Sequence, residues 1–249
     1  MVITSQVLNR TSLAIIALLA SLSVAVAGTK SEREHQCLFG NVKQIIVSES
    51  TCSNKSGKWV EGKRAYDRTV NYDVKGNLIK EVRYDGTVRA PSETNYHYDS
   101  KGNRTDSVYL NNSKSQLFRF VRRLFKCDAN HNRIEELVYS READGPIEGE
   151  ILTERYLHSY DNNGNRATTE YYHYGVFTYK SICDYDTKGT LAEQSFYSKS
   201  GKLQMKELYS YEFDTVGNWI KRVTKNQRIE HSKVYTESMK VTYQTISYY

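Results

Sequence analysis

The sequence predicts an all-β fold, an antiparallel meander of repeated hairpins forming one curved, twisted open sheet of about 12–14 strands. Three observations lead to this prediction. A six-residue motif recurs at nearly even spacing, apolar and polar residues alternate before many of its copies, and the segments between copies are too short for a crossover helix. A chain of 249 residues accommodates one all-β domain or two smaller ones.

The motif is Tyr-Asp-x-x-Gly-Asn, and six copies, some of them degenerate, occur in the chain. They occupy residues 72–77, 98–103, 127–132, 160–165, 185–190 and 213–218. Their Asp residues lie 26, 29, 33, 25 and 28 positions apart. This regularity indicates one repeated structural unit.

Each motif is typical of a tight turn between two strands. Asp at the first turn position accepts hydrogen bonds from backbone amides, and Gly at the fourth adopts the left-handed conformation that leads into a hairpin. In the third copy His131 replaces Gly, which predicts a slightly strained turn. Alternatively, the Asp row could bind Ca²⁺ or act in acid–base chemistry, but one Asp per repeat supplies few of the six to eight oxygens that Ca²⁺ needs.

Each return strand is expected to meet a second turn, so that every unit contains two strands and two turns. These second turns are expected at residues 85–86, 111–112, 144–145, 199–201 and 226–227. An open meander leaves unpaired edge strands, which invite another chain unless they are covered.

Residues 1–27 are typical of a secretory signal peptide. Arg10 precedes an apolar run, and Ala25-Val26-Ala27 provides a small-x-small pattern for cleavage after Ala27. An uncleaved anchor is the alternative. The mature β-domain, residues 28–249, carries a net charge of +5 once Arg10 is removed. No later apolar stretch reaches membrane length, so we expect a secreted or periplasmic protein with no membrane span in its mature chain.

The four cysteines all lie in the mature chain, at positions 37, 52, 127 and 183. An oxidising compartment favours disulfides, and four cysteines allow three pairings. A local bridge between Cys37 and Cys52 is the preferred pairing, and sequence alone does not choose among the three.

No catalytic, cofactor or metal site is expected. The six His residues share no metal-ligand spacing, and His158 is expected to be packed or hydrogen-bonded. Neither a Gly-x-Ser-x-Gly elbow nor a Gly-rich phosphate loop occurs. Acidic and basic residues are interleaved, which argues against a nucleic-acid partner. The densest basic cluster, Arg119, Arg122, Arg123 and Lys126, either contacts anionic polysaccharide or lipid headgroups or forms a solvated strand face.

Tyr is unusually frequent, with 21 residues against 7 Phe and 2 Trp. Tyr171, Tyr172 and Tyr174 cluster, so rings occur on both faces of one expected strand. An outward ring could stack on a sugar. The competing interpretation, which we favour, is that Tyr rungs pack across neighbouring strands.

The repeated motif resembles that of the YD-repeat, or Rhs-type, family over roughly residues 66–225. The segment 38–45, Leu-Phe-Gly-Asn-Val-Lys-Gln-Ile, is similar to the opening of small secreted bacterial proteins with such repeats. The resemblance implies a β-sheet scaffold and sometimes glycan binding, and it does not imply catalysis. The toxin payload of large members has no counterpart in this chain.

The expected function is therefore that of a secreted, non-enzymatic scaffold or interaction protein. It would act through its sheet surface at the cell envelope or outside the cell, with a protein or a cell-envelope glycan as partner. The alternative is a carbohydrate-binding module that uses outward Tyr residues. The candidate ligand-binding residues are Tyr171, Tyr172, Tyr174, Arg119, Arg122 and Arg123.

Overall fold

The computed structural model describes residues 31–84, 91–98, 104–111, 119–142, 149–230 and 233–249. The predicted signal peptide lies outside these residues. The described chain contains one short helix, α1 (Glu32–His35), and fifteen strands. Among the described residues, no helix is long and apolar enough to cross a membrane.

Within the described residues, the strands follow one another with no helix between them. They are β1 (Val42–Lys55), β2 (Lys58–Glu61), β3 (Ala65–Tyr72), β4 (Leu78–Arg83), β5 (Ser92–Tyr98), β6 (Arg104–Asn111), β7 (Arg119–Cys127), β8 (Arg133–Glu142), β9 (Ile151–Tyr160), β10 (Arg166–His173), β11 (Val176–Tyr185), β12 (Leu191–Ser198), β13 (Leu203–Phe213), β14 (Trp219–Glu230) and β15 (Lys233–Tyr248).

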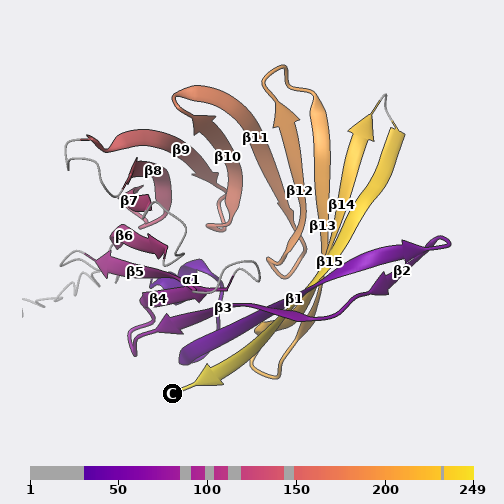
Figure 1. Ribbon diagram of the computed structural model, residues 1–249, viewed down its shortest axis with the longest axis horizontal. Helices are drawn as coiled ribbons and strands as arrows, with labels where there is room; N and C mark the ends of the chain where they lie inside the picture. The colour runs from indigo at the N-terminus through magenta and orange to yellow at the C-terminus, as the bar shows by residue number, and fades with distance from the viewer. Residues whose placement is uncertain (1–30, 85–90, 99–103, 112–118, 143–148, 231–232) are drawn as a thin grey trace, which may run out of the picture.

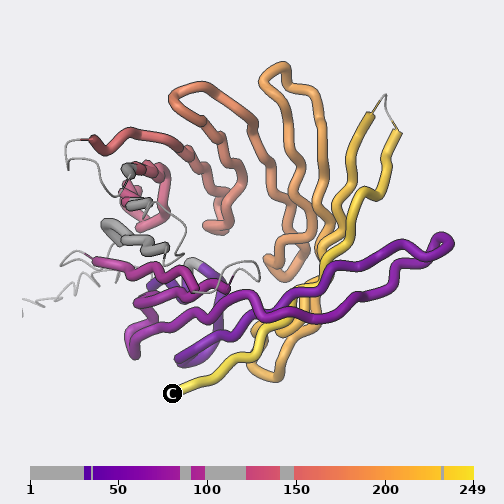
Figure 2. Tube along the Cα trace, viewed as in Figure 1, coloured from indigo at the N-terminus to yellow at the C-terminus, as the bar shows by residue number. Residues whose placement is uncertain are grey.

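All fifteen strands belong to one antiparallel sheet in the order β15 down to β3, then β1 and β2. This arrangement confirms the predicted all-β meander, and Figure 1 shows how strongly the sheet curves. An additional pairing joins β15 to β1, from Val42 opposite Tyr248 to Cys52 opposite Met239. The first and last strands therefore lie side by side (Figure 2), and the edge that β15 would otherwise expose is hydrogen-bonded along most of its length.

The motif forms the predicted turn. In the fourth copy, the Gly164 amide donates to the Asp161 carbonyl at 3.0 Å, and the Asp161 amide donates to the Asn165 carbonyl at 2.9 Å. Asp161 Oδ1 also accepts from the amides of Asn163 and Asn165 at 2.9 and 2.8 Å. Gly164 has a φ of 80° and His131, its equivalent in the third copy, has a φ of 61°. The Asp carboxylates of the five described turns are therefore turn-formers, as predicted, whereas the second copy's turn, residues 99–103, lies outside the described residues.

In three copies of the motif, the Tyr before the Asp joins one hairpin to the preceding one. The hydroxyl of Tyr98 donates to the Leu78 carbonyl at 2.9 Å, and that of Tyr160 donates to the Arg133 carbonyl at 2.9 Å. In the next repeat, Tyr185 donates to the Arg166 carbonyl at 3.0 Å. Each acceptor directly follows the Asn of the preceding motif, which explains why this position favours Tyr over Phe.

Of the predicted second turns, only the one at residues 199–201 is confirmed. There the Gly201 amide donates to the Ser198 carbonyl at 2.9 Å. The turn at residues 226–227 was predicted wrongly, because Asn226 and Gln227 lie inside β14 and pair with Ser238 and Thr236 of β15. A β-bulge between them and a bond from Asn226 Nδ2 to Ser238 Oγ at 2.8 Å accommodate these polar residues within the strand. The other three positions fall wholly or partly outside the described residues.

Residues 31–41, here called the N-terminal strap, lie against the inner face of the sheet, the face towards which it curves. Figure 1 shows α1 beside β3 and β4 on this side. The Arg33 amide donates to the Gly76 carbonyl at 3.0 Å, and the Tyr72 hydroxyl donates to Gln36 Oε1 at 2.6 Å. Leu38 joins the buried core of Val42, Ile45, Val47, Val70, Tyr72 and Leu78. The strap and this small core pin one end of the sheet.

Replacing His131 by Gly should stabilise the protein. A non-glycine residue in the left-handed region costs free energy that Gly does not, so we expect His131→Gly to raise the free energy of unfolding by about 1 kcal/mol. The reciprocal variant, Gly164→His, should lower it by a similar amount. Urea denaturation of both variants measures the effect, and a His131→Gly variant less stable than the parent would contradict this account of the turn.

Candidate functional site

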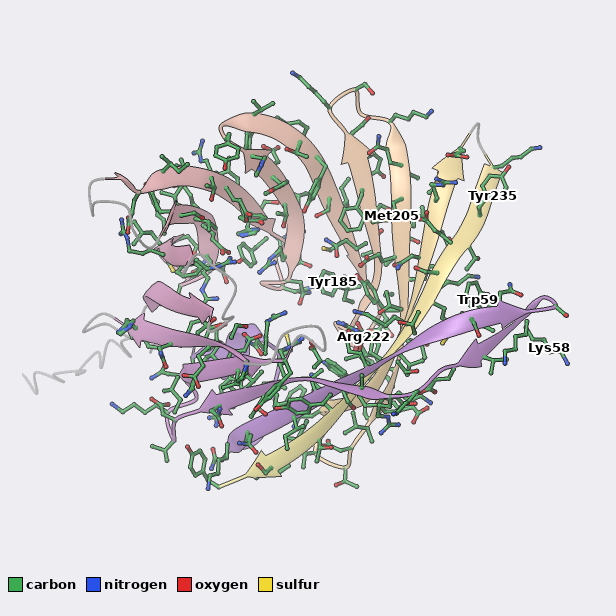
Figure 3. The ribbon with its side chains drawn as sticks, in the orientation of Figure 1. Lys58, Trp59, Tyr185, Met205, Arg222 and Tyr235 are labelled. Atoms are coloured by element: carbon green, nitrogen blue, oxygen red, sulfur yellow. The ribbon has the colours of Figure 1, made fainter. Side chains whose placement is uncertain are left out.

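The strap and the motif turns of β9–β14 enclose two adjoining cavities, here together called the turn-end cleft. One has a volume of about 480 Å³ and the other about 460 Å³. Five residues line both cavities: Gln36, Cys37, Asn165, Tyr185 and Leu191. Figure 3 shows Tyr185 and Arg222 on the inner side of the curved sheet, whereas Lys58 and Trp59 lie on the β1–β2 hairpin away from it.

The first cavity is lined mainly by charged and amide side chains and is here called the polar cavity. On its wall, Arg133 forms a two-pronged ion pair with Glu32 of α1, with Nη1 to Oε1 at 3.1 Å. Glu32 is 4% exposed. Burial works against the charge of Arg133, but the hydrogen bond and charge of Glu32 raise its pKa. This pair joins α1 to the sheet. Removing either partner would leave the other charge buried and uncompensated, so the contact is costly to break.

The second cavity, here called the aromatic cavity, is lined by five rings: Phe39, Tyr185, Tyr211, Phe213 and Trp219. The Trp219 ring meets Tyr211 edge-on at 6.1 Å between centroids. Phe39 and Phe213 are 55% and 47% exposed. Ring surface of this extent facing a cavity is typical of a binding site.

The aromatic cavity lies where the Tyr rungs are interrupted. Phe213 stands in the sixth copy where the fourth and fifth copies carry Tyr160 and Tyr185, and it has no hydroxyl to donate to the preceding hairpin. Neighbouring polar groups from Asn165, Thr190 and Gln36 line the same cavity. A flat ligand could therefore lie against rings and form hydrogen bonds with side-chain amides and hydroxyls.

Above the cleft, a row of rings runs across the inner face from β9 to β12. Ring centroids are 4.9 Å apart for Tyr156 and Tyr171, 5.1 Å for Tyr171 and Tyr179, and 5.7 Å for Tyr179 and Phe196. These contacts confirm the interpretation that Tyr rungs pack across strands. Next to the row, His158 Nδ1 lies 2.9 Å from Thr169 Oγ1, so this His is hydrogen-bonded, as predicted. Burial, followed by the charges of Arg166 and Arg133, lowers the pKa of His158 to about 3.

The three candidate Tyr residues do not share a surface. Tyr171 belongs to the inner row, whereas the Tyr172 ring lies on the opposite face, edge-on to Phe177 at 5.5 Å. Tyr174 stands in the β10–β11 turn with a φ of 46° and is 55% exposed. Their role in ligand binding stays a prediction.

The basic candidates are likewise divided between the two faces of β7. Arg122 donates to Glu150 Oε2 at 2.6 Å and lies over the Tyr139 ring, whereas Arg123 is bonded to Glu136. Arg119 is the first residue of β7, and its side chain is outside the described part of the structure. Both described guanidinium groups are thus engaged in internal ion pairs.

The preferred Cys37–Cys52 bridge is wrong. All four cysteines are free thiols. Cys52 lies near the far end of β1, ten residues beyond Val42, which amounts to about 30 Å of extended strand. Cys37 instead lies in the strap, where it and Cys183 line the polar cavity.

Apart from Cys37 and Cys183, which were considered only as disulfide partners, the sequence did not single out the residues that line the cleft. Asn165, Tyr185 and Phe213 belong to the motif and were interpreted only as turn and strand residues. Phe39 and Arg133 come from other parts of the chain, so no local pattern connects them. The one available signal was Phe213, which departs from Tyr in the motif. Within the described residues, no group of three or more His, Cys, Asp or Glu side chains could hold a metal ion.

No family model and no curated protein matches the chain. Among solved structures, it is similar to a porin-like protein from Bacteroides uniformis, with a TM-score of 0.51 and 12% identity over 83% of this chain and 96% of that one. A porin-like protein from Bacteroides vulgatus gives a TM-score of 0.42 and 11% identity over 84% and 98% of the two chains. The first similarity concerns the fold alone, because proteins that share a fold differ widely in function.

Replacing Asn218 by Ala should destabilise the strap. The Phe39 amide donates to Asn218 Oδ1 at 2.7 Å, and Asn218 Nδ2 donates to the Phe39 carbonyl at 2.9 Å. We expect Asn218→Ala to lower the free energy of unfolding by about 2–3 kcal/mol and to speed hydrogen exchange at the Phe39 amide. Asn77→Ala, the same change in a hairpin that does not bind the strap through this side chain, should cost about 1 kcal/mol. Equal losses in the two variants would contradict the anchoring role.

Acidification should weaken the fold through His158. Its pKa is about 3 when folded against an ordinary 6.5, so between these values the unfolded chain binds a proton that the folded chain does not. The stability that neutral His158 contributes is therefore complete above pH 6.5 and is lost as the pH falls towards 3.

The His158→Gln variant tests this pH dependence by urea denaturation at pH 7.5 and pH 5. The parent should lose on the order of 2 kcal/mol more than the variant between these two values. Acids with lowered pKa, such as Asp186 and Glu193, act in the same direction but from lower ordinary values, 3.8 and 4.5, and they are present in both proteins. Identical losses in parent and variant would rule out His158 as the cause.

Proposed function

We propose that this chain is a non-enzymatic binding protein of the cell envelope that holds its ligand in the turn-end cleft. The observation that carries the proposal is the aromatic cavity, where the exposed rings of Phe39 and Phe213 face the same space as Trp219. Apolar ring surface is costly to leave in water, and a ligand that covers it gains the corresponding free energy. The surrounding side chains supply stacking and hydrogen bonds, which are binding interactions.

Two observations support a location in the envelope. Residues 1–27 have the pattern of a secretory signal. The fold is similar to that of a protein described as porin-like, although this similarity bears on architecture alone.

The presence of the cleft favours a ligand-binding protein over a purely structural scaffold. It also places the proposed binding site at a different position from the one expected from the sequence. The sequence-based alternative used outward Tyr residues, whereas the rings proposed here face inward at the turn ends. Rings from β11, β13, β14 and the strap meet there, so the site depends on the folded sheet and not on one strand.

A second candidate site for a protein partner lies on the hairpin of β14 and β15. Val234 and Tyr235 are 57% and 48% exposed. They precede Met239, the first β15 residue along the chain that pairs with β1. Among the described strands, this part of β15 therefore pairs only with β14. Such an edge can accept an added strand.

Fluorescence of Trp219 tests the proposed function directly. The chain has two Trp residues, so Trp59→Phe leaves Trp219 as the sole Trp reporter in the cleft. We expect saturable changes in its emission during titration with at least one of three probes: chitotetraose, cellotetraose or a short aromatic peptide. Phe213→Ala should weaken that binding about tenfold, because one ring contact is worth about 1 kcal/mol or more.

Tyr235→Ala is the matched control, since it removes an equally exposed ring outside the cleft. Its affinity should equal that of the parent. Probe binding that isothermal titration calorimetry detects, that depends on Tyr235 and that leaves Trp219 emission unchanged would refute the cleft and favour the hairpin edge.

A further inference from the structure

The Asn that ends the repeated motif shows two different arrangements in this protein. In three hairpins its Nδ2 donates back to the Asp Oδ2 of the same turn. The distances are 3.0 Å for Asn77 and Asp73, 3.1 Å for Asn132 and Asp128, and 3.1 Å for Asn165 and Asp161. In these hairpins the carboxamide closes its own turn.

In the sixth hairpin the carboxamide of Asn218 binds another segment of the chain. Its oxygen accepts from the Phe39 amide at 2.7 Å, and its Nδ2 donates to the Phe39 carbonyl at 2.9 Å. The Tyr248 hydroxyl replaces the usual link by donating to Asp214 Oδ2 at 2.7 Å and accepting from Asn218 Nδ2 at 2.8 Å. A motif Asn can therefore bind both backbone polar groups of one residue in a neighbouring peptide segment.

Asn165 is placed to do the same for a ligand. It lines the polar cavity, the aromatic cavity and a third cavity on the rim next to Asp161 and Asp186. Its Nδ2 has one hydrogen bonded to Asp161, which leaves a second hydrogen available. Within the described part of the chain, its carboxamide oxygen has no bonded donor, and the side chain is half-buried at the cleft.

The walls around Asn165 suit an extended chain with an apolar side chain. Gln36 and Cys37 of the strap form one side, and Tyr185 and Leu191 form the other. Phe213 and Trp219 continue the aromatic surface beyond them. The lining of the cleft therefore offers a ligand what Asn218 and its surroundings offer the strap, a carboxamide beside aromatic rings.

We propose that the turn-end cleft binds an extended peptide segment, and that the Asn165 carboxamide pairs with the N–H and C=O of one of its residues. This inference rests on the proposed function and specifies its ligand. A peptide presents a donor and an acceptor on the same residue, which is the pair that Asn218 binds on Phe39. An apolar side chain of the bound residue occupies the aromatic cavity.

The test uses a synthetic peptide that copies residues 36–41 with the change Cys37→Ser, because this segment is the one seen in a carboxamide pairing. Binding to the full chain carrying Trp59→Phe is followed by Trp219 emission. Asn165→Ala should weaken binding at least about tenfold through loss of both hydrogen bonds. The matched control is Asn77→Ala, which removes the same Asn-to-Asp bond in a hairpin outside the cleft and should leave the affinity within about twofold.

Thermal unfolding of both variants is the control for a folding defect. Each variant loses one equivalent Asn-to-Asp hydrogen bond, so their unfolding midpoints should agree. Equal peptide affinity in the Asn165→Ala and Asn77→Ala variants overturns the inference. So does binding of chitotetraose or cellotetraose without binding of the peptide, although the proposed function then stands. If none of the probes changes Trp219 emission, the proposed function fails together with this inference.

Discussion

The turn that each Asp closes is the constraint on which the rest of this structure depends. One carboxylate accepts several backbone amides, and the residue three places later adopts a left-handed conformation, so the chain reverses within a few residues. The pairing register of the two strands shifts just before each described turn, as between Asp184 and Tyr185 or between Glu212 and Phe213. These shifts are typical of the bulge that accompanies such turns, and they set the direction of the side chain before each Asp.

Because the turns repeat, the residues before the Asp line up at one end of the sheet. Where this residue is Tyr, its hydroxyl ties one hairpin to the previous one, as Tyr160 and Tyr185 do. Where it is Phe213, a ring is left facing the cleft. A single change in the repeat thus converts a structural position into binding surface, and the N-terminal strap supplies the opposite wall.

Much of the fold could be predicted from local pattern. The motif turns, the antiparallel pairing and the packed Tyr rungs were expected, and residues such as Gly164, Asp161 and Tyr171 behave accordingly. A turn was also expected at residues 226–227, but these residues continue β14, where Asn226 Nδ2 donates to Ser238 Oγ across the sheet. Turn propensity is a weak signal when a long partner strand offers alternative hydrogen bonds. No family model matches the chain, so its resemblance to YD-repeat proteins stays a prediction.

The sequence by itself determined the repeat unit, because the Asp and Gly positions act within a few residues of one another. Only the tertiary structure decided that β15 pairs with β1, that Glu32 meets Arg133, and that Asn218 holds Phe39 across 179 positions of sequence. These contacts depend on how the curvature of many hairpins accumulates, which no single repeat encodes. The cleft arises from that accumulated curvature, and so its residues become neighbours only in the folded chain.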